Sequence, residues 1–150
     1  MEDRLELASG IKLTGDEMRY IALFESVTRA TALDCIIDGR NDRVIFVAKQ
    51  GDMGLAIGKG GKNVGLLRKL LGKPVEVVEY SDSPDQLVKN SLAPARIRSV
   101  RMAEKPGRRI LIIEVDPKDK ALAIGRNGKT IEKTRMLVKR YFQIDHVTVT

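Results

Sequence analysis

The sequence contains one segment twice. Residues 56–64 (AIGKGGKNV) return as residues 123–131 (AIGRNGKTI), 67 positions further along the chain, and the correspondence continues on both sides without gaps. Two copies are too few for a stacked-repeat solenoid, which generally needs at least three. We therefore expect two small domains of one fold, at residues 1–80 and 81–150, in a chain of 150 residues that can bury a modest core in each.

The first copy predicts one order of helices and strands. Thr14 and Glu17 suit a capping box, and apolar residues at helical spacing follow them. Apolar runs separated by turn residues then indicate the remaining elements. In chain order these are a helix at 15–31, a hairpin of strands at 32–37 and 43–49, a short helical turn at 53–57, a helix that stops at Gly72, and a strand at 75–80.

The second copy predicts the same order. Ser83 suits a helix N-cap, with Pro84 at the first helical position and Gln86 placed to complete a second box. A hairpin at 97–103 and 108–115, a helix at 130–141 and a strand at 144–150 follow. Both copies read αββααβ, which places the chain in the α+β class, with helices on one face of a three-stranded mixed sheet.

The charge balance favours a polyanionic partner. Lys and Arg number 27 against 20 Asp and Glu, which gives a formal net charge of +7. Aromatic residues make up only 4% of the chain, which argues against modules that stack bases on an aromatic sheet. Further basic candidates lie on the long helices, where a solvated face is the plainer interpretation: Arg68, Lys69, Arg135, Lys139 and Arg140.

A glycine loop before the long helix is the candidate site in each copy. Glycines let the backbone approach a ligand closely, and the amides at the start of the following helix favour phosphate oxygens. One such loop is often only a compact turn, but the basic second position and the flanking Ile and Lys occur in both copies. The candidate residues are Ile57, Gly58, Lys59, Gly60, Gly61 and Lys62, and Ile124, Gly125, Arg126, Asn127, Gly128 and Lys129.

The aliphatic residues before each loop have two interpretations. Leu55 and Ile57 in the first copy, like Leu122 and Ile124 in the second, either belong to the core or form the floor of a groove that receives bases. We expect most of them to be core.

The loop and the order of elements resemble the type II KH domain, in which a G-x-x-G loop holds the backbone of about four nucleotides. The segments 79–84 (EYSDSP) and 90–97 (NSLAPARI) resemble the junction between the tandem KH domains of the NusA family. The resemblance covers nearly the whole chain, with the first dozen residues least secure. It implies a fold of two tandem type II KH domains.

The resemblance also implies a function. It points to a non-enzymatic factor that binds single-stranded RNA and takes part in transcription termination or antitermination, with RNA polymerase or other elongation proteins as further partners. The chain lacks room for the N-terminal polymerase-binding domain of the bacterial members, so the resemblance leaves open whether RNA polymerase is bound directly. Asn127 stands where the first loop has Gly60, which leaves open a weaker contact, or a protein-docking role, in the second copy.

Other functions fit less well. Residues 123–130 nearly match a nucleotide-binding P-loop, but Ala123 replaces its first glycine and the preceding segment reads as helix. A KH protein of the ribosome or of ribosome assembly remains an alternative. Asp116 and Asp119 precede a helix, where capping is the plainer interpretation than acid–base chemistry.

Cofactors, metals and membranes are not expected. Cys35 lies in a predicted strand, where it is interpreted as a small core residue. One cysteine and one histidine, His146, are too few ligands for a metal site and give no basis for Cys/His catalysis. No apolar run is long enough to cross a bilayer, and the first residues lack a secretory signal, so we expect a cytoplasmic protein. The sequence specifies no oligomeric state, and a monomer is assumed.

Overall fold

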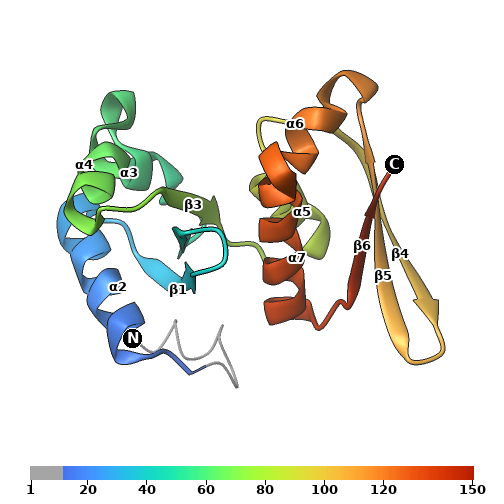
Figure 1. Cartoon of the computed structure of the whole chain (residues 1–150), viewed down its shortest axis with the longest axis horizontal. Coiled ribbons are helices and arrows are strands. Elements are labelled where there is room, and N and C mark those ends of the chain that lie inside the picture. Colours follow the sequence, from blue (N-terminus) through green and yellow to red (C-terminus); the bar gives the residue numbers. More distant parts are fainter. Residues whose placement is uncertain (1–11) are drawn as a thin grey trace. The chain divides into compact units, whose positions relative to one another are not determined.

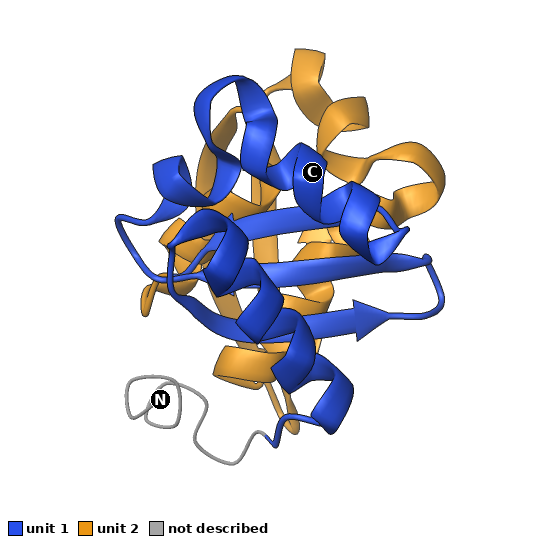
Figure 2. Ribbon diagram, turned by 90° about the vertical axis from the view of Figure 1, so that its left-hand side faces the viewer, with its two compact units in different colours: residues 1–80 blue, residues 81–150 orange. Residues whose placement is uncertain are grey.

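The computed structural model describes residues 12–150, and the chain divides into two compact units, residues 1–80 and 81–150 (Figures 1 and 2). Residues 1–11 of the expected first domain lie outside the described residues. Unit 1 contains, in chain order, α2 (Gly15–Thr28), β1 (Ala32–Asp38), β2 (Arg43–Ala48), α3 (Met53–Ile57), the 3₁₀ turn η1 (Lys59–Gly61), α4 (Lys62–Leu71) and β3 (Val75–Glu79). Unit 2 contains α5 (Pro84–Leu92), β4 (Ile97–Lys105), β5 (Arg108–Val115), the 3₁₀ turn η2 (Pro117–Asp119), α6 (Lys120–Ile124), η3 (Arg126–Gly128), α7 (Lys129–Phe142) and β6 (His146–Val149).

Both sheets are three-stranded and mixed, as predicted. In unit 1 the central strand β2 pairs antiparallel with β1 and parallel with β3. In unit 2 the central strand β5 pairs antiparallel with β4 and parallel with β6. A parallel pair needs a crossover connection, and in each unit the two helices around the glycine loop provide it. The predicted α+β class and the αββααβ order are confirmed.

The helices of unit 1 cover one face of its sheet (Figure 2). Phe46 on β2 stacks on Phe24 of α2 with ring centroids 4.6 Å apart. Ala56 of α3 and Leu67 of α4 join the same buried cluster, and so does Cys35 of β1. Because α2, α3 and α4 all contribute to one apolar core, the glycine loop between α3 and α4 is held on packed elements.

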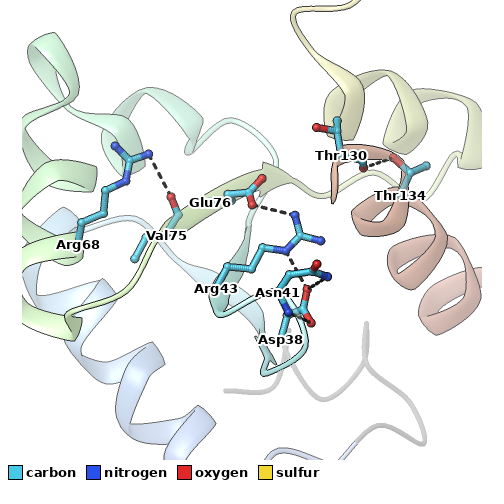
Figure 3. Close-up of polar contacts among 8 residues, drawn as sticks. All are labelled: Asp38, Asn41, Arg43, Arg68, Val75, Glu76, Thr130 and Thr134. Atoms are coloured by element: carbon cyan, nitrogen blue, oxygen red, sulfur yellow. Dashed lines mark hydrogen bonds and ion pairs between the residues drawn. The ribbon is translucent and has the colours of Figure 1, made fainter. Parts of the chain in front are cut away.

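The core of unit 2 repeats this arrangement, with one polar addition. Its buried cluster draws on α5, α6, α7 and the sheet, through side chains such as Val88, Leu92, Ala123, Val138 and Ile113. Within it, the hydroxyl groups of Ser91 on α5 and Thr134 on α7 lie 2.7 Å apart and share a hydrogen bond. Thr134 also donates to the carbonyl oxygen of Thr130 at 3.5 Å, one turn earlier on α7 (Figure 3). Both hydroxyls therefore have partners, as buried polar groups require.

The end of one helix and the capping box of another differ from the predictions. The Thr14–Glu17 capping box is present, but α2 ends at Thr28 rather than at residue 31, because Arg29 adopts the left-handed conformation with φ 63°. The second box is incomplete. Ser83 accepts a hydrogen bond from the Gln86 amide, whereas the Gln86 side chain donates to Asn90.

The two acidic residues before α6 have different roles. Asp116 caps η2 by accepting a hydrogen bond from the amide of Lys118 at 3.0 Å, as predicted. Asp119 makes no cap hydrogen bond. Its Oδ2 instead accepts from the backbone amide and from Nε of Arg96, at 2.8 and 2.9 Å. These two hydrogen bonds connect the segment before β4 to the start of α6, and the side-chain one lowers the pKa of Asp119.

An ion-pair cluster closes the β1–β2 hairpin (Figure 3). Arg43 donates from Nε to Asp38 Oδ2 at 2.9 Å and from Nη1 to Glu76 Oε2 on β3 at 3.0 Å. Asn41 in the turn donates its side-chain amide to the same Asp38 oxygen at 2.9 Å. Asp38 and Arg43 are 6% and 3% exposed, so each charge depends on its partner. Burial acts to raise the pKa of Asp38, but the hydrogen bonds from Asn41 and Arg43 outweigh it and lower that pKa below its usual value.

This cluster predicts a pH-dependent stability. A carboxyl whose pKa is lower in the folded state stabilises the fold above its unfolded pKa of about 3.9, and the stabilisation is lost as pH falls through the folded value. We expect Asp38→Asn to lower the free energy of unfolding by about 1–2 kcal/mol at pH 7, and the gap to narrow as the pH falls through the lowered pKa of Asp38. Denaturant unfolding of both proteins across pH 2–7 measures this. A gap that is constant with pH would contradict the assignment.

Candidate nucleic-acid interface

The glycine loop of unit 1 begins where α3 ends. Gly58 has φ 77° and ψ 165°, and its amide donates to the carbonyl of Gly54 at 2.9 Å. A Cβ at Gly58 would lie 2.9 Å from Cγ and 3.0 Å from the backbone nitrogen of Asn63. Asn63 is held there because its side-chain amide donates to the carbonyl oxygen of Leu55 at 2.8 Å. The first glycine therefore lets the start of α4 lie directly against the end of α3.

The loop of unit 2 has the same backbone conformation with a different neighbour. Gly125 has φ 81° and ψ 168°. A Cβ here would collide with Oγ1 of Thr130, and would also lie 2.8 Å from the Cβ and 2.8 Å from the backbone nitrogen of that residue. Thr130 stands where unit 1 has Asn63. The close approach of the two helices is thus a property of both loops.

The third position of each loop, Gly60 or Asn127, has the same backbone conformation in both units. Asn127 has φ 57° and ψ 25°, and Gly60 has φ 64° and ψ 19°. Both residues occupy the left-handed region, which Asn tolerates better than most non-glycine residues. Asn127 therefore preserves the shape of the second loop, and its side chain is exposed.

Each loop exposes two adjacent backbone donors. The amides of Gly61 and Gly128 are used within the loops, where they donate to the carbonyls of Gly58 and Gly125. The amides of Lys59 and Gly60, and those of Arg126 and Asn127, make no hydrogen bond to any residue in the described part of the chain. All four of these residues are exposed, as are Lys62 and Lys129 at the starts of the next helices. The arrangement joins free N–H groups, a helix N-terminus and basic side chains, which together suit an anion.

The aliphatic neighbours of the loops are more exposed than expected. The exposed fractions are 51% for Leu55, 49% for Leu122 and 36% for Ile124, so the expectation of core positions is wrong for these three. Ile57 alone is half-buried and packs against the core of unit 1. The short helices α3 and α6 fully bury only one small residue each, Ala56 and Ala123, and leave the side chains of Leu55, Leu122 and Ile124 exposed.

A groove of about 450 Å³ lies beside the second loop. It runs between the end of α6, the start of α7 and the strand β6, and is lined by Ile124, Gly128, Ile131, Arg135, Val147, Thr148 and Val149. Only Ile124 and Gly128 of these were candidate site residues from the sequence, and Arg135 was a secondary one. The contribution of β6 was missed, because the sequence predicts a strand there but not which loop it faces.

The strand β6 offers main-chain hydrogen-bonding groups to this groove. It lies at the edge of its sheet and pairs only with β5 in the described structure. Thr150, just after the strand, donates to Ile113 and accepts from Val115, so its polar groups point toward β5. Polar groups alternate in direction along a strand, so those of Val147 and Val149 point to the open edge.

The extra basic residues on the long helices are placed differently. Arg68 donates from Nη2 to the carbonyl oxygen of Val75 at 3.2 Å (Figure 3). Lys139 donates to Asp145 at 2.6 Å, and this hydrogen bond lowers the pKa of Asp145. Arg135 lies 3.5 Å from Glu132 and lines the groove. Of these three, Arg135 is the one that lines the groove beside the second loop.

Three further features of the described residues concern the other readings of the sequence. A P-loop follows a strand, whereas Ala123 lies in the helix α6. Among residues 12–150, no group of three or more His, Cys, Asp or Glu side chains is placed to hold a metal ion. None of the described helices combines the length and the apolar composition needed to span a bilayer.

Comparison with known proteins gives concordant matches to both halves. Residues 18–89 match the KH domain family, and residues 84–149 match the NusA-like second KH domain. A probable transcription termination protein NusA of Halococcus morrhuae is 42% identical over 91% of this chain and 96% of its own length. Its counterpart in Methanocaldococcus jannaschii is 33% identical over 93% of this chain and 75% of its own length.

A solved structure shares the fold. The crystal structure of a protein designated APE1850 aligns with a TM-score of 0.83 at 40% identity, and covers 92% of this chain and all of that one. The predicted pair of tandem KH domains is thereby confirmed. The chain belongs to the family of NusA-like transcription termination proteins built from two KH domains.

Proposed function

We propose that this protein binds single-stranded RNA through both glycine loops and, through that binding, takes part in transcription termination or antitermination. The observation that carries the proposal is the pair of exposed amides at the same place in each loop, beside a basic side chain and a helix N-terminus. The relatives are named as probable transcription termination proteins, and these names support the biological setting of the proposal.

The proposed mechanism is reversible binding without bond chemistry. The amides of Lys59 and Gly60, and of Arg126 and Asn127, donate to phosphate oxygens, and the basic side chains at 59 and 126 neutralise phosphate charge. Phosphate contacts fix the register of the strand. The bases then lie in the aliphatic groove beside the loop, where the free edge of β6 and the apolar lining discriminate among them by hydrogen bonding and fit.

The proposal predicts a steep salt dependence. Neutralising about four to six phosphates of a single strand gives a slope of about −3 to −4 for log affinity against log salt concentration. Fluorescence anisotropy of a labelled oligoribonucleotide between 50 and 300 mM KCl measures it. A slope near zero would mean that phosphates are not neutralised, and the loops would then have another role.

A further inference from the structure

The two units place equivalent arginines in different surroundings. Arg68 on α4 and Arg135 on α7 occupy matching positions in the repeat, 67 residues apart. Arg68 donates to the carbonyl of Val75, at the start of the edge strand of its own unit (Figure 3). Arg135 has no such bond to its edge strand, and it lines the groove beside the second loop. The same residue type is therefore anchored in one unit and available in the other.

Two local changes in the sequence cause this difference. First, α7 has 14 residues where α4 has 10, so the edge strand of unit 2 begins later relative to the arginine. Second, Glu132 lies one turn before Arg135, at the position that Gly65 occupies in unit 1. The Glu132 carboxylate is 3.5 Å from the Arg135 guanidinium, and the two side chains are 36% and 48% exposed. A pair this exposed and this long is weak, so a ligand can displace it.

The chemistry of the groove lining indicates what Arg135 recognises. Among the described residues that line the groove, Arg135 carries the only charged side chain, and the others are aliphatic residues, a glycine and a threonine. A guanidinium has several N–H donors in a planar fork and no acceptor. It binds two adjacent acceptors best, which guanine presents as O6 and N7 and cytosine as O2 and N3. Adenine and uracil place a donor beside each acceptor on the corresponding edges.

We propose that Arg135 is a specificity-determining residue of the second unit, which selects a nucleobase edge with two adjacent acceptors, while Arg68 makes no such selection in the first unit. This inference rests on the proposed RNA binding. It specifies that unit 2 discriminates among bases and that the guanidinium group of Arg135 does so. A phosphate contact by Arg135 is the competing role. The two roles of Arg135 can be told apart by substitution. Loss of a base contact changes the sequence preference of binding, whereas loss of a phosphate contact changes its salt dependence.

The test uses the full chain with the first loop disabled by Lys59→Asp and Gly60→Asp, so that unit 2 dominates RNA binding. The probes are oligoadenylates of about eight nucleotides with a central guanine, cytosine or uracil, compared with oligoadenylate itself. We expect guanine or cytosine to raise affinity about 5- to 100-fold, since a bidentate arginine contact gives discrimination of this size. The separate guanine and cytosine probes identify which base is selected.

Substitutions then assign the preference to the arginine fork. Arg135→Met, and also Arg135→Lys, which keeps the charge but loses the fork, should abolish the preference while the salt slope stays nearly constant. The matched control is Arg68→Met in the chain whose second loop carries Arg126→Asp and Asn127→Asp, where base preference should not change.

Four results would overturn the inference. An equal loss for every probe, with a salt slope shallower by about 0.7, would make Arg135 a phosphate contact. A preference that survives Arg135→Met would assign discrimination to other groups. If the unmodified chain binds RNA but the chain with its first loop disabled does not, unit 2 has no RNA groove. If the unmodified chain itself does not bind RNA, the proposed function fails as well.

Discussion

Replacing Lys59 and Gly60 with Asp, together with Arg126 and Asn127 with Asp, is expected to lower the affinity for single-stranded RNA by about 100-fold or more. Each double substitution removes a cation and places two carboxylates where phosphate oxygens would lie. Charge-assisted hydrogen bonds contribute about 1.5–3 kcal/mol each, so losing them in even one loop accounts for a tenfold to hundredfold change. Either double substitution alone should give an intermediate loss, measured by fluorescence anisotropy at a fixed salt concentration.

The fold should tolerate these substitutions. A Cβ at Gly60 meets no atom within 4 Å, and Asp is among the residues that accept a positive φ. Asn127 shows that a short polar side chain already occupies this position in unit 2. Lys105→Asp with Pro106→Asp is the matched control, since it changes net charge equally at the tip of the β4–β5 hairpin, at the opposite end of β5 from the second loop. Circular dichroism checks the fold, and an equal loss of affinity in the control would show that net charge alone governs binding.

Replacing Gly125 with Ala is expected to lower the free energy of unfolding by about 3–4 kcal/mol. The backbone conformation at φ 81° is strained for any residue with a Cβ, and the new methyl group would collide with Thr130. Strain of this kind costs about 1–3 kcal/mol, and overpacking adds about as much again. Denaturant unfolding of the full chain, followed by far-ultraviolet circular dichroism, measures the loss.

A nearby glycine separates the two causes. Gly128 has φ 73°, but a Cβ there meets nothing within 4 Å, so Gly128→Asn should cost only about 1 kcal/mol. In the double variant Gly125→Ala and Thr130→Ala, stability should recover only in part, because the backbone nitrogen at position 130 still lies 2.8 Å from the added Cβ. Equal losses at Gly125 and Gly128 would show that the helices do not approach closely at the first glycine.

Local patterns in the sequence predict most of this fold. Helix starts are accurate because side chains such as Thr14 and Ser83 cap them within three residues. The end of α4 is accurate because Gly72 adopts the left-handed conformation that favours glycine. The end of α2 is not, because Arg29 takes a left-handed conformation that its residue type does not signal.

The site is predictable in part. The repeated motif locates both loops and their basic residues, since glycine spacing encodes backbone conformation directly. The groove depends on which strand lies beside the loop, and Val147 and Val149 acquire that role only through the parallel pairing of β6 with β5. The exposure of Leu55 and Leu122 is likewise a tertiary property, because each of these five-residue helices fully buries one small side chain and turns its leucine away from the core.

The central claim is that the exposed amides in the two loops bind the phosphates of an RNA strand. Amide chemical shifts during titration of the labelled full chain with a single-stranded oligoribonucleotide test it most directly. We expect the largest changes at the N–H signals of Lys59, Gly60, Arg126 and Asn127, with smaller changes along β6 and little change at the tip of the β4–β5 hairpin. RNA binding that leaves all four signals unmoved would contradict the account.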